Sequence, residues 1–160
     1  MDFYTFIQLL IVSITATSAM TAFSYAASGK FQELYKEPVL LSYMLKIFKV
    51  KLPGQSKTTW GWIVHFLIGY WFVIVYHWLW ITDVLPISLL SALLLGALSG
   101  IIGILGWMLI FRLSHHPPKI NFKGYYIQLF IAHIIFAIVA TAIYFVSLTI
   151  LILAKAYITI

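Results

Sequence analysis

The chain has 160 residues, enough for one soluble domain or for a small bundle of helices in a bilayer. Hydrophobic residues make up 63% of it and charged residues 9%, whereas soluble domains carry roughly 25% charged residues, so we expect the lipid bilayer as its surroundings. The net charge of +6 comes from basic residues that lie beside apolar runs rather than in an arginine- and lysine-rich surface, which excludes a nucleic-acid partner.

The first apolar run covers residues 3–27, and a helix needs about 20 residues to span a hydrocarbon core. No basic segment precedes the run, and the run is longer than the apolar part of a secretory signal, so we predict a retained first transmembrane helix. Ser13, Thr17 and Thr21 follow one another at intervals of four and share one face of that helix. Such side chains pack helices together more often than they line a polar conduit.

Residues 28–59 form the extended polar stretch of the chain and contain six lysines. Within it, Pro38 to Val50 predicts a short amphipathic helix, because proline suits a first helical turn. We expect this helix to lie in the membrane interface, with Lys46 and Lys49 on its polar side. Pro53-Gly54 then predicts a turn. The apolar face of the predicted helix consists of Leu40, Leu41, Met44, Leu45, Ile47 and Phe48.

The second span is predicted at residues 60–82. Trp60 and Trp62 mark one end of it, and Trp78 and Trp80 mark the other. Tryptophan gathers at both membrane–water interfaces, so this arrangement is typical of a spanning helix.

A tight turn at residues 83–86 leads to a third predicted span at 87–111, which is rich in small residues. Gly96 and Gly100 form a small-xxx-small pair, and Gly103 continues the series. Small residues let helix backbones approach closely, so we interpret these glycines as a packing surface rather than as room for a ligand.

A polar loop at 112–124 precedes the fourth span, at 125–153, which is longer than a bilayer needs and should tilt or protrude. The sequence thus predicts one all-α membrane domain over residues 1–160, a four-helix bundle with an interfacial helix between its first two spans. Nine of the ten lysines and arginines fall in the loops at 28–59 and 112–124, which an even number of crossings puts on one side. Both loops should therefore be cytoplasmic and both termini outside.

Histidine gives the main chemical pattern. His65 and His133 should lie at matched depth, roughly 8–12 Å below the cytoplasmic edge at 1.5 Å per residue, with His115 and His116 in the loop on the same side. Imidazole ligates transition metals and haem iron, so His65 and His133 are candidate cofactor ligands and His115 and His116 candidate metal ligands. Hydrogen-bonded contact between helices is the commoner role of such residues. His77 should lie near the opposite face and outside this group.

Other chemistry is sparse. The chain has no cysteine, which excludes disulfides, iron–sulfur clusters and thiol catalysis. We find no nucleophile paired with a base and no phosphate-binding glycine motif, so the sequence does not indicate an enzyme. No Asp, Glu, Lys or Arg falls in the middle of a predicted span, which argues against proton-coupled transport unless histidine serves.

Several short segments of the chain form a further pattern: Ala16-Thr17-Ser18-Ala19-Met20-Thr21, Gly61-Trp62-Ile63-Val64-His65-Phe66 with Gly69, Gly96-Ala97-Leu98-Ser99-Gly100, the His-Pro-Pro loop, and Ala132-His133-Ile134-Ile135-Phe136. Together they resemble small bacterial four-helix inner-membrane proteins of unknown function. The resemblance spans most of the chain and implies a bacterial cytoplasmic membrane protein, without implying an activity. It draws attention to His65 and His133, and the lysine-rich first loop departs from it.

Three functions stay open at this point. The first is a structural, accessory or binding subunit that associates with another membrane protein or with a second copy through the glycine-rich third span. The second is a haem- or metal-binding protein that uses His65 and His133. The third is a small-solute transporter or channel.

Overall fold

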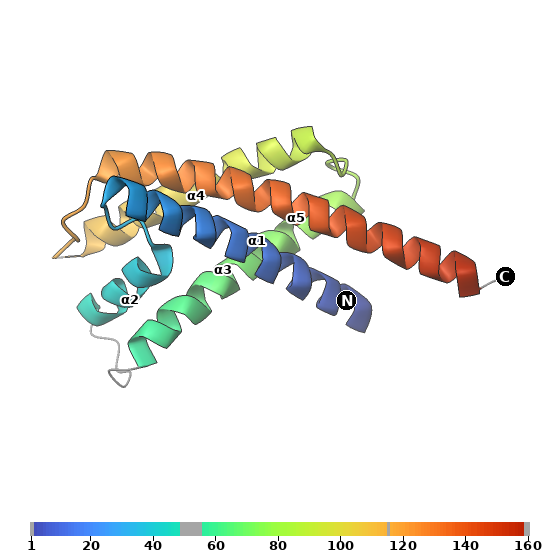
Figure 1. Cartoon of the computed structure of the whole chain (residues 1–160), viewed down its shortest axis with the longest axis horizontal. Helices are drawn as coiled ribbons and strands as arrows, with labels where there is room; N and C mark the ends of the chain where they lie inside the picture. The colour runs from blue at the N-terminus through green and yellow to red at the C-terminus, as the bar shows by residue number, and fades with distance from the viewer. Residues whose placement is uncertain (1, 49–55, 115, 159–160) are drawn as a thin grey trace.

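The computed structural model describes residues 2–48, 56–114 and 116–158, which contain five α-helices and no strand. All but the short second helix are long and apolar enough to cross a membrane. The fold is therefore the expected all-α bundle of four transmembrane helices (Figure 1). The helices are α1 (Phe3–Phe31), α2 (Glu37–Ile47), α3 (Ser56–Ile81), α4 (Leu89–Leu113) and α5 (Phe122–Ile158).

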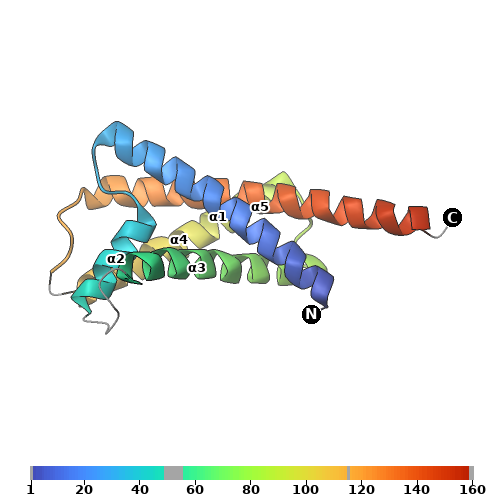
Figure 2. The ribbon, with the colours of Figure 1, turned by 60° about the horizontal axis from the view of Figure 1, so that its bottom comes forward.

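Both ends of the chain lie at one end of the bundle, and α2 and the described part of the stretch between α4 and α5 lie at the other (Figures 1 and 2). The lysine-rich connections thus share one side, as an even number of crossings requires. Figure 2 shows α1 crossing α3 diagonally, while the C-terminal turns of α5 extend beyond the other helices.

Local capping sets the helix limits. The Asp2 carboxylate accepts a hydrogen bond from the Thr5 N–H at 2.7 Å and so caps α1, and the Ser88 hydroxyl accepts one from the Ser91 N–H at 3.2 Å to cap α4. In the turn after α3, Asp83 adopts a left-handed conformation with φ of 54°, which ends the helix and allows the tight reversal predicted there.

All four spanning helices extend beyond the predicted spans at the end where the loops lie: α1 to Phe31, α3 from Ser56, α4 to Leu113 and α5 from Phe122. Hydropathy marks the stretch that lipid would solvate, whereas backbone hydrogen bonding continues into the polar flanks. The short helix α2 ends at Ile47 rather than Val50. Val50 and the turn predicted at Pro53-Gly54 lie outside the described residues.

The apolar face predicted for the short helix largely contacts protein rather than an open interface. Leu40 and Met44 of α2 are 0% and 3% exposed, and α2 packs closely along α3. Gly61 permits this approach, since a Cβ there would lie 2.5 Å from the carbonyl oxygen of Pro38 and 2.9 Å from the backbone nitrogen of Ser42. This packing turns the first residue of α2 toward the interior of the bundle.

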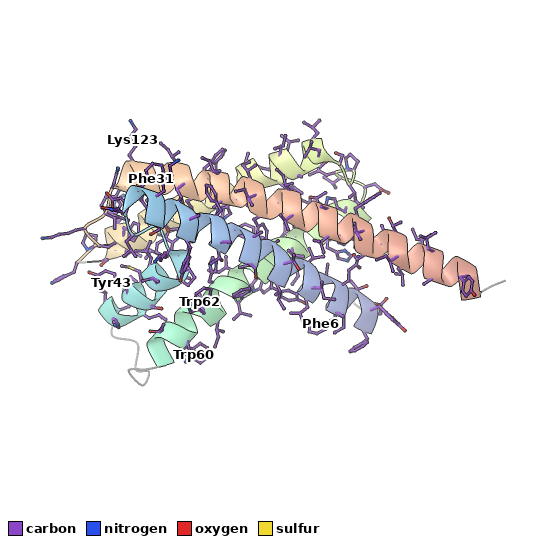
Figure 3. The ribbon with its side chains drawn as sticks, in the orientation of Figure 1. Phe6, Phe31, Tyr43, Trp60, Trp62 and Lys123 are labelled. Carbon is purple, nitrogen blue, oxygen red and sulfur yellow. The ribbon has the colours of Figure 1, made fainter. Side chains whose placement is uncertain are left out.

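The aromatic residues predicted to mark the ends of the second span divide into two kinds. Trp60 and Trp62 lie on the early turns of α3, at the end where the loops lie (Figure 3), and Trp78 is exposed at the other end. Trp80, by contrast, is 5% exposed and packs on Tyr144 of α5 with ring centroids 4.4 Å apart. Trp80 thus lies on the last turn of α3, at the predicted end of the span, and its ring fills the contact between α3 and α5.

Candidate functional site

The glycines predicted as a packing surface lie between α4 and α5 of the same chain. A Cβ at Gly96 would lie 2.7 Å from the Cα of Ile134, and one at Gly100 would lie 2.9 Å from the Phe130 ring. Both glycines are buried. The expected contact surface for a partner or a second copy is thus already occupied within the chain, since α5 covers it.

The contact between α3 and α4 is different. Close backbone packing joins α4 to α5, α5 to α1, and α1 to α3, but nothing comparable joins α3 to α4 in the described part of the chain. Side chains bridge these helices instead: the Tyr76 hydroxyl donates to Ser99 Oγ at 2.8 Å. Next to this bridge, the ring of Phe72 of α3 lies edge-on to the ring of His133 of α5, with centroids 5.7 Å apart. Helices held apart in this way leave space between them.

A cavity of about 200 Å³ fills this space. Ile68 of α3 and Ile102 of α4 line it and are 43% and 58% exposed, so the cavity reaches the outer surface of the bundle, which lipid would cover. Gly106 also lines it, and a Cβ there would meet no atom within 4 Å. Most of the lining is apolar. The side chains with titratable or hydroxyl groups among the lining residues are Thr17, Glu37, His65 and His133.

The structure brings His65 and His133 to this one cavity, where they are 5% and 6% exposed. His65 Nε2 lies 2.9 Å from Thr21 Oγ1, and His133 Nδ1 lies 2.8 Å from the carbonyl oxygen of Leu129. The hydroxyls predicted on the first helix therefore face the bundle interior: Thr21 holds His65, and Ser13 is buried as well.

The remaining histidines lie elsewhere. His77 Nδ1 is 2.9 Å from the Tyr144 hydroxyl, away from the cavity lining, as predicted for a residue near the opposite face. His116 is exposed, and its carbonyl accepts a hydrogen bond from Tyr43 at 3.3 Å. His115 lies outside the described residues. Within the residues that are described, no three His, Cys, Asp or Glu side chains gather as metal ligands.

Glu37, the first residue of α2, is an unpredicted part of the site. It is 2% exposed, and its Oε1 accepts hydrogen bonds from Ser24 Oγ at 2.8 Å and from Gln128 Nε2 at 3.3 Å. Gln128 also donates to Ser24 at 2.6 Å, so α1, α2 and α5 meet at this carboxyl group. Burial raises the pKa of Glu37 to about 7, an effect that its backbone, Ser24 and Gln128 hydrogen bonds partly offset.

Glu37 also changes the argument against proton-coupled transport, which rested on the lack of charged residues in the middle of the predicted spans. The expectation considered acids within the spans, whereas α2 carries its acid into the bundle from a connecting segment. A signal was present in the sequence: Ser24 extends the hydroxyl series of the first helix, and Gln128 stands alone in an apolar run. Buried hydrogen-bonding side chains need partners, and few polar residues could have supplied them.

The arrangement can bind a small molecule that is mostly apolar and carries a hydrogen-bonding group. Two imidazoles, one carboxyl group and one threonine hydroxyl line an otherwise apolar space. Ligand sites commonly combine a mostly apolar lining with a few polar groups in this way. Comparison with protein families, with characterised proteins and with solved structures finds no match to this chain.

Proposed function

We propose that this chain is a membrane protein that binds a small lipid-soluble molecule in the cavity between α3 and α4. The observation that carries the proposal is the position of that cavity, which reaches the lipid-facing surface beside Ile68 and Ile102 and has buried polar groups further in. A ligand dissolved in the bilayer could enter sideways, with its apolar part toward the lipid and its polar group toward His133 and Glu37.

The volume favours a ligand the size of a single ring. Benzene binds in an apolar cavity of about 150 Å³, whereas sites for drug-sized ligands run to roughly 300–1,000 Å³. At about 200 Å³ the cavity suits a substituted ring better than a macrocycle such as haem. This argument favours the binding function over a haem held by His65 and His133.

We also propose that the protein resides in a bacterial cytoplasmic membrane with both termini outside. The support is the resemblance described above together with the charge bias, since nine of the ten basic residues fall in the stretches 28–59 and 112–124 of the sequence. The described parts of these two stretches share one end of the bundle. Reporter fusions at the loop that contains Lys119 and at the N-terminus test the orientation. An external reporter signal from the Lys119 loop would contradict it.

Filling the cavity tests the binding function. Gly106→Phe would place a ring in the space where a Cβ meets nothing within 4 Å, so it should block the cavity without a clash. Gly29→Phe is the matched control, because a Cβ at Gly29 also meets nothing within 4 Å and Gly29 does not line the cavity. Lipid-soluble molecules would be extracted from each purified protein and identified by mass spectrometry.

The expected result is a compound enriched in the wild-type protein and in Gly29→Phe and depleted at least tenfold in Gly106→Phe. Titration of the three proteins with 4-ethylphenol in identical micelles serves as a second readout that needs no endogenous ligand. Binding that is the same in all three would contradict the proposed function, because partition into the micelle would then explain it.

A further inference from the structure

The hydrogen-bonding groups that line the cavity are mostly acceptors, and His133 is the first of them. Its Nδ1 lies 2.8 Å from the carbonyl oxygen of Leu129, which can only accept, so Nδ1 carries the proton. A charged ring would be costly in this buried place, so we assign the neutral form, whose Nε2 is an acceptor. Gly103 locates that atom at the cavity wall, since a Cβ on this lining residue would lie 3.0 Å from it.

The nitrogen of His65 that carries the proton can be assigned in the same way, from its hydrogen bond with Thr21. Thr21 Oγ1 lies 2.7 Å from the carbonyl oxygen of Thr17. A carbonyl oxygen can only accept, so the single proton of the Thr21 hydroxyl is donated to it. Thr21 Oγ1 therefore accepts from His65 Nε2, 2.9 Å away. The neutral ring of His65 then has its acceptor at Nδ1, which makes no hydrogen bond to the described residues.

Glu37 adds a third acceptor above a pH of about 7, where its carboxyl group is ionised. The side-chain hydrogen bonds that it receives from Ser24 and Gln128 go to Oε1, while the buried Oε2 has no partner among the described residues. Thr17 Oγ1, beside Gly69, is also buried without a partner and can donate or accept. Trp107 also lines the cavity and carries an indole N–H, which can only donate. With Glu37 ionised, the acceptors on His133, His65 and Glu37 outnumber this donor among the polar atoms of the described cavity lining.

We propose that the cavity selects a ligand whose polar group donates hydrogen bonds, a hydroxyl on a single ring, over a ligand of the same shape that can only accept. The inference rests on the proposed function and narrows its ligand class. The physical reason is that a donor satisfies a buried acceptor, whereas an acceptor-only ligand brings its lone pairs against those of His133 and Glu37 and leaves all of them unpaired.

The test compares 4-ethylphenol with 4-ethylanisole, in which a methyl group replaces the hydroxyl proton. Both are titrated by ligand-detected NMR into the full-length protein in identical micelles at pH 8, where Glu37 is ionised. One net hydrogen bond corresponds to about tenfold in affinity, so the wild-type protein should bind the phenol about tenfold more tightly.

Two variants then remove acceptors while keeping shape. In Glu37→Gln the amide oxygen must take the place of Oε1 to accept from Ser24 and Gln128, so the amide nitrogen takes that of Oε2 and a donor replaces an acceptor. His133→Phe removes the acceptor Nε2. The phenol preference should fall below about threefold in either variant. His77→Phe makes the same ring change outside the cavity lining and should leave the preference unchanged.

The outcomes separate the inference from the proposed function. If wild-type protein binds both compounds equally and Gly106→Phe abolishes binding of both, the binding function stands and the donor preference is wrong. The donor preference is also wrong if it persists in both Glu37→Gln and His133→Phe. Equal binding of both compounds by wild type and Gly106→Phe contradicts the two proposals together.

Discussion

The helix α4 meets α5 through glycines and faces α3 through large aromatic side chains, and the two contacts have opposite results. At Gly96 and Gly100 the backbones come so close that an added methyl group has no room. On the other side the Tyr76 side chain bridges α3 and α4 through Ser99, and a cavity that Phe72 lines lies between these helices. Because lipid is as apolar as the helix surfaces, close packing rather than hydrophobic burial drives helix association in a bilayer. Side-chain size therefore decides which contact closes and which leaves a site.

The largest expected effect comes from breaking the close contact between α4 and α5. Gly96→Leu would place its Cβ 2.7 Å from the Cα of Ile134, a backbone atom that cannot move aside without shifting α5. We expect a loss of roughly 3 kcal/mol in the free energy of unfolding. Gly106→Leu makes the same change on the side of α4 that lines the cavity. We expect this variant to leave the free energy of unfolding unchanged or to raise it by about 0.5–1 kcal/mol, because glycine is a poor helix former. Unfolding in SDS measures both, and equal losses would contradict the comparison.

The next effect concerns Glu37, the acid that lines the cavity. Because the pKa of Glu37 is raised in the folded state to about 7, the folded protein retains this proton when the unfolded chain has lost it. Stability should therefore fall as the pH rises from about 4.5 to about 7 and then level off. Glu37→Gln should remove that slope and be more stable than wild type at pH 8, by on the order of 2–3 kcal/mol. Unfolding midpoints in SDS between pH 5 and pH 8 give the comparison, and parallel pH profiles would show that another group is responsible.

A smaller effect is expected at the bridge across the open side. Tyr76→Phe removes the hydrogen bonds of its hydroxyl to Ser99 Oγ at 2.8 Å and to the Leu95 carbonyl at 3.2 Å. The ring remains, so the helices should stay apart and the cavity should keep its volume. We expect a loss of about 1 kcal/mol in unfolding free energy with ligand binding retained. A variant with normal stability and no binding would mean that the hydroxyl, rather than the ring, maintains the cavity.

The smallest effect is expected at the surface. The exposed Tyr43 hydroxyl donates to the carbonyl oxygen of His116 at 3.3 Å, a long bond that water can replace. Tyr43→Phe should change the unfolding free energy by less than about 0.5 kcal/mol and leave binding unaltered. A larger change in SDS unfolding would show that the contact between α2 and the α4–α5 connection stabilises the site.

Much of this architecture could be predicted from the sequence, because hydropathy and helix length report directly on lipid solvation. The four spans and the convergence of His65 and His133 followed from those rules, since depth in a helix is proportional to residue number. The role of Glu37 could not be derived in this way. A carboxylate before Pro38 looks like an ordinary helix start, and only the packing of α2 on Gly61 turns it inward. The glycine face was recognisable, but its partner, α5, depends on the three-dimensional arrangement.

The cavity between α3 and α4 can be tested most directly with a crystal of the protein under xenon pressure. Xenon enters apolar cavities of this size. An anomalous peak bounded by Gly106, Phe72 and His133 is the predicted result. Xenon sites confined to the outer lipid-facing surface, with side chains filling the space beside Gly106, would contradict the account.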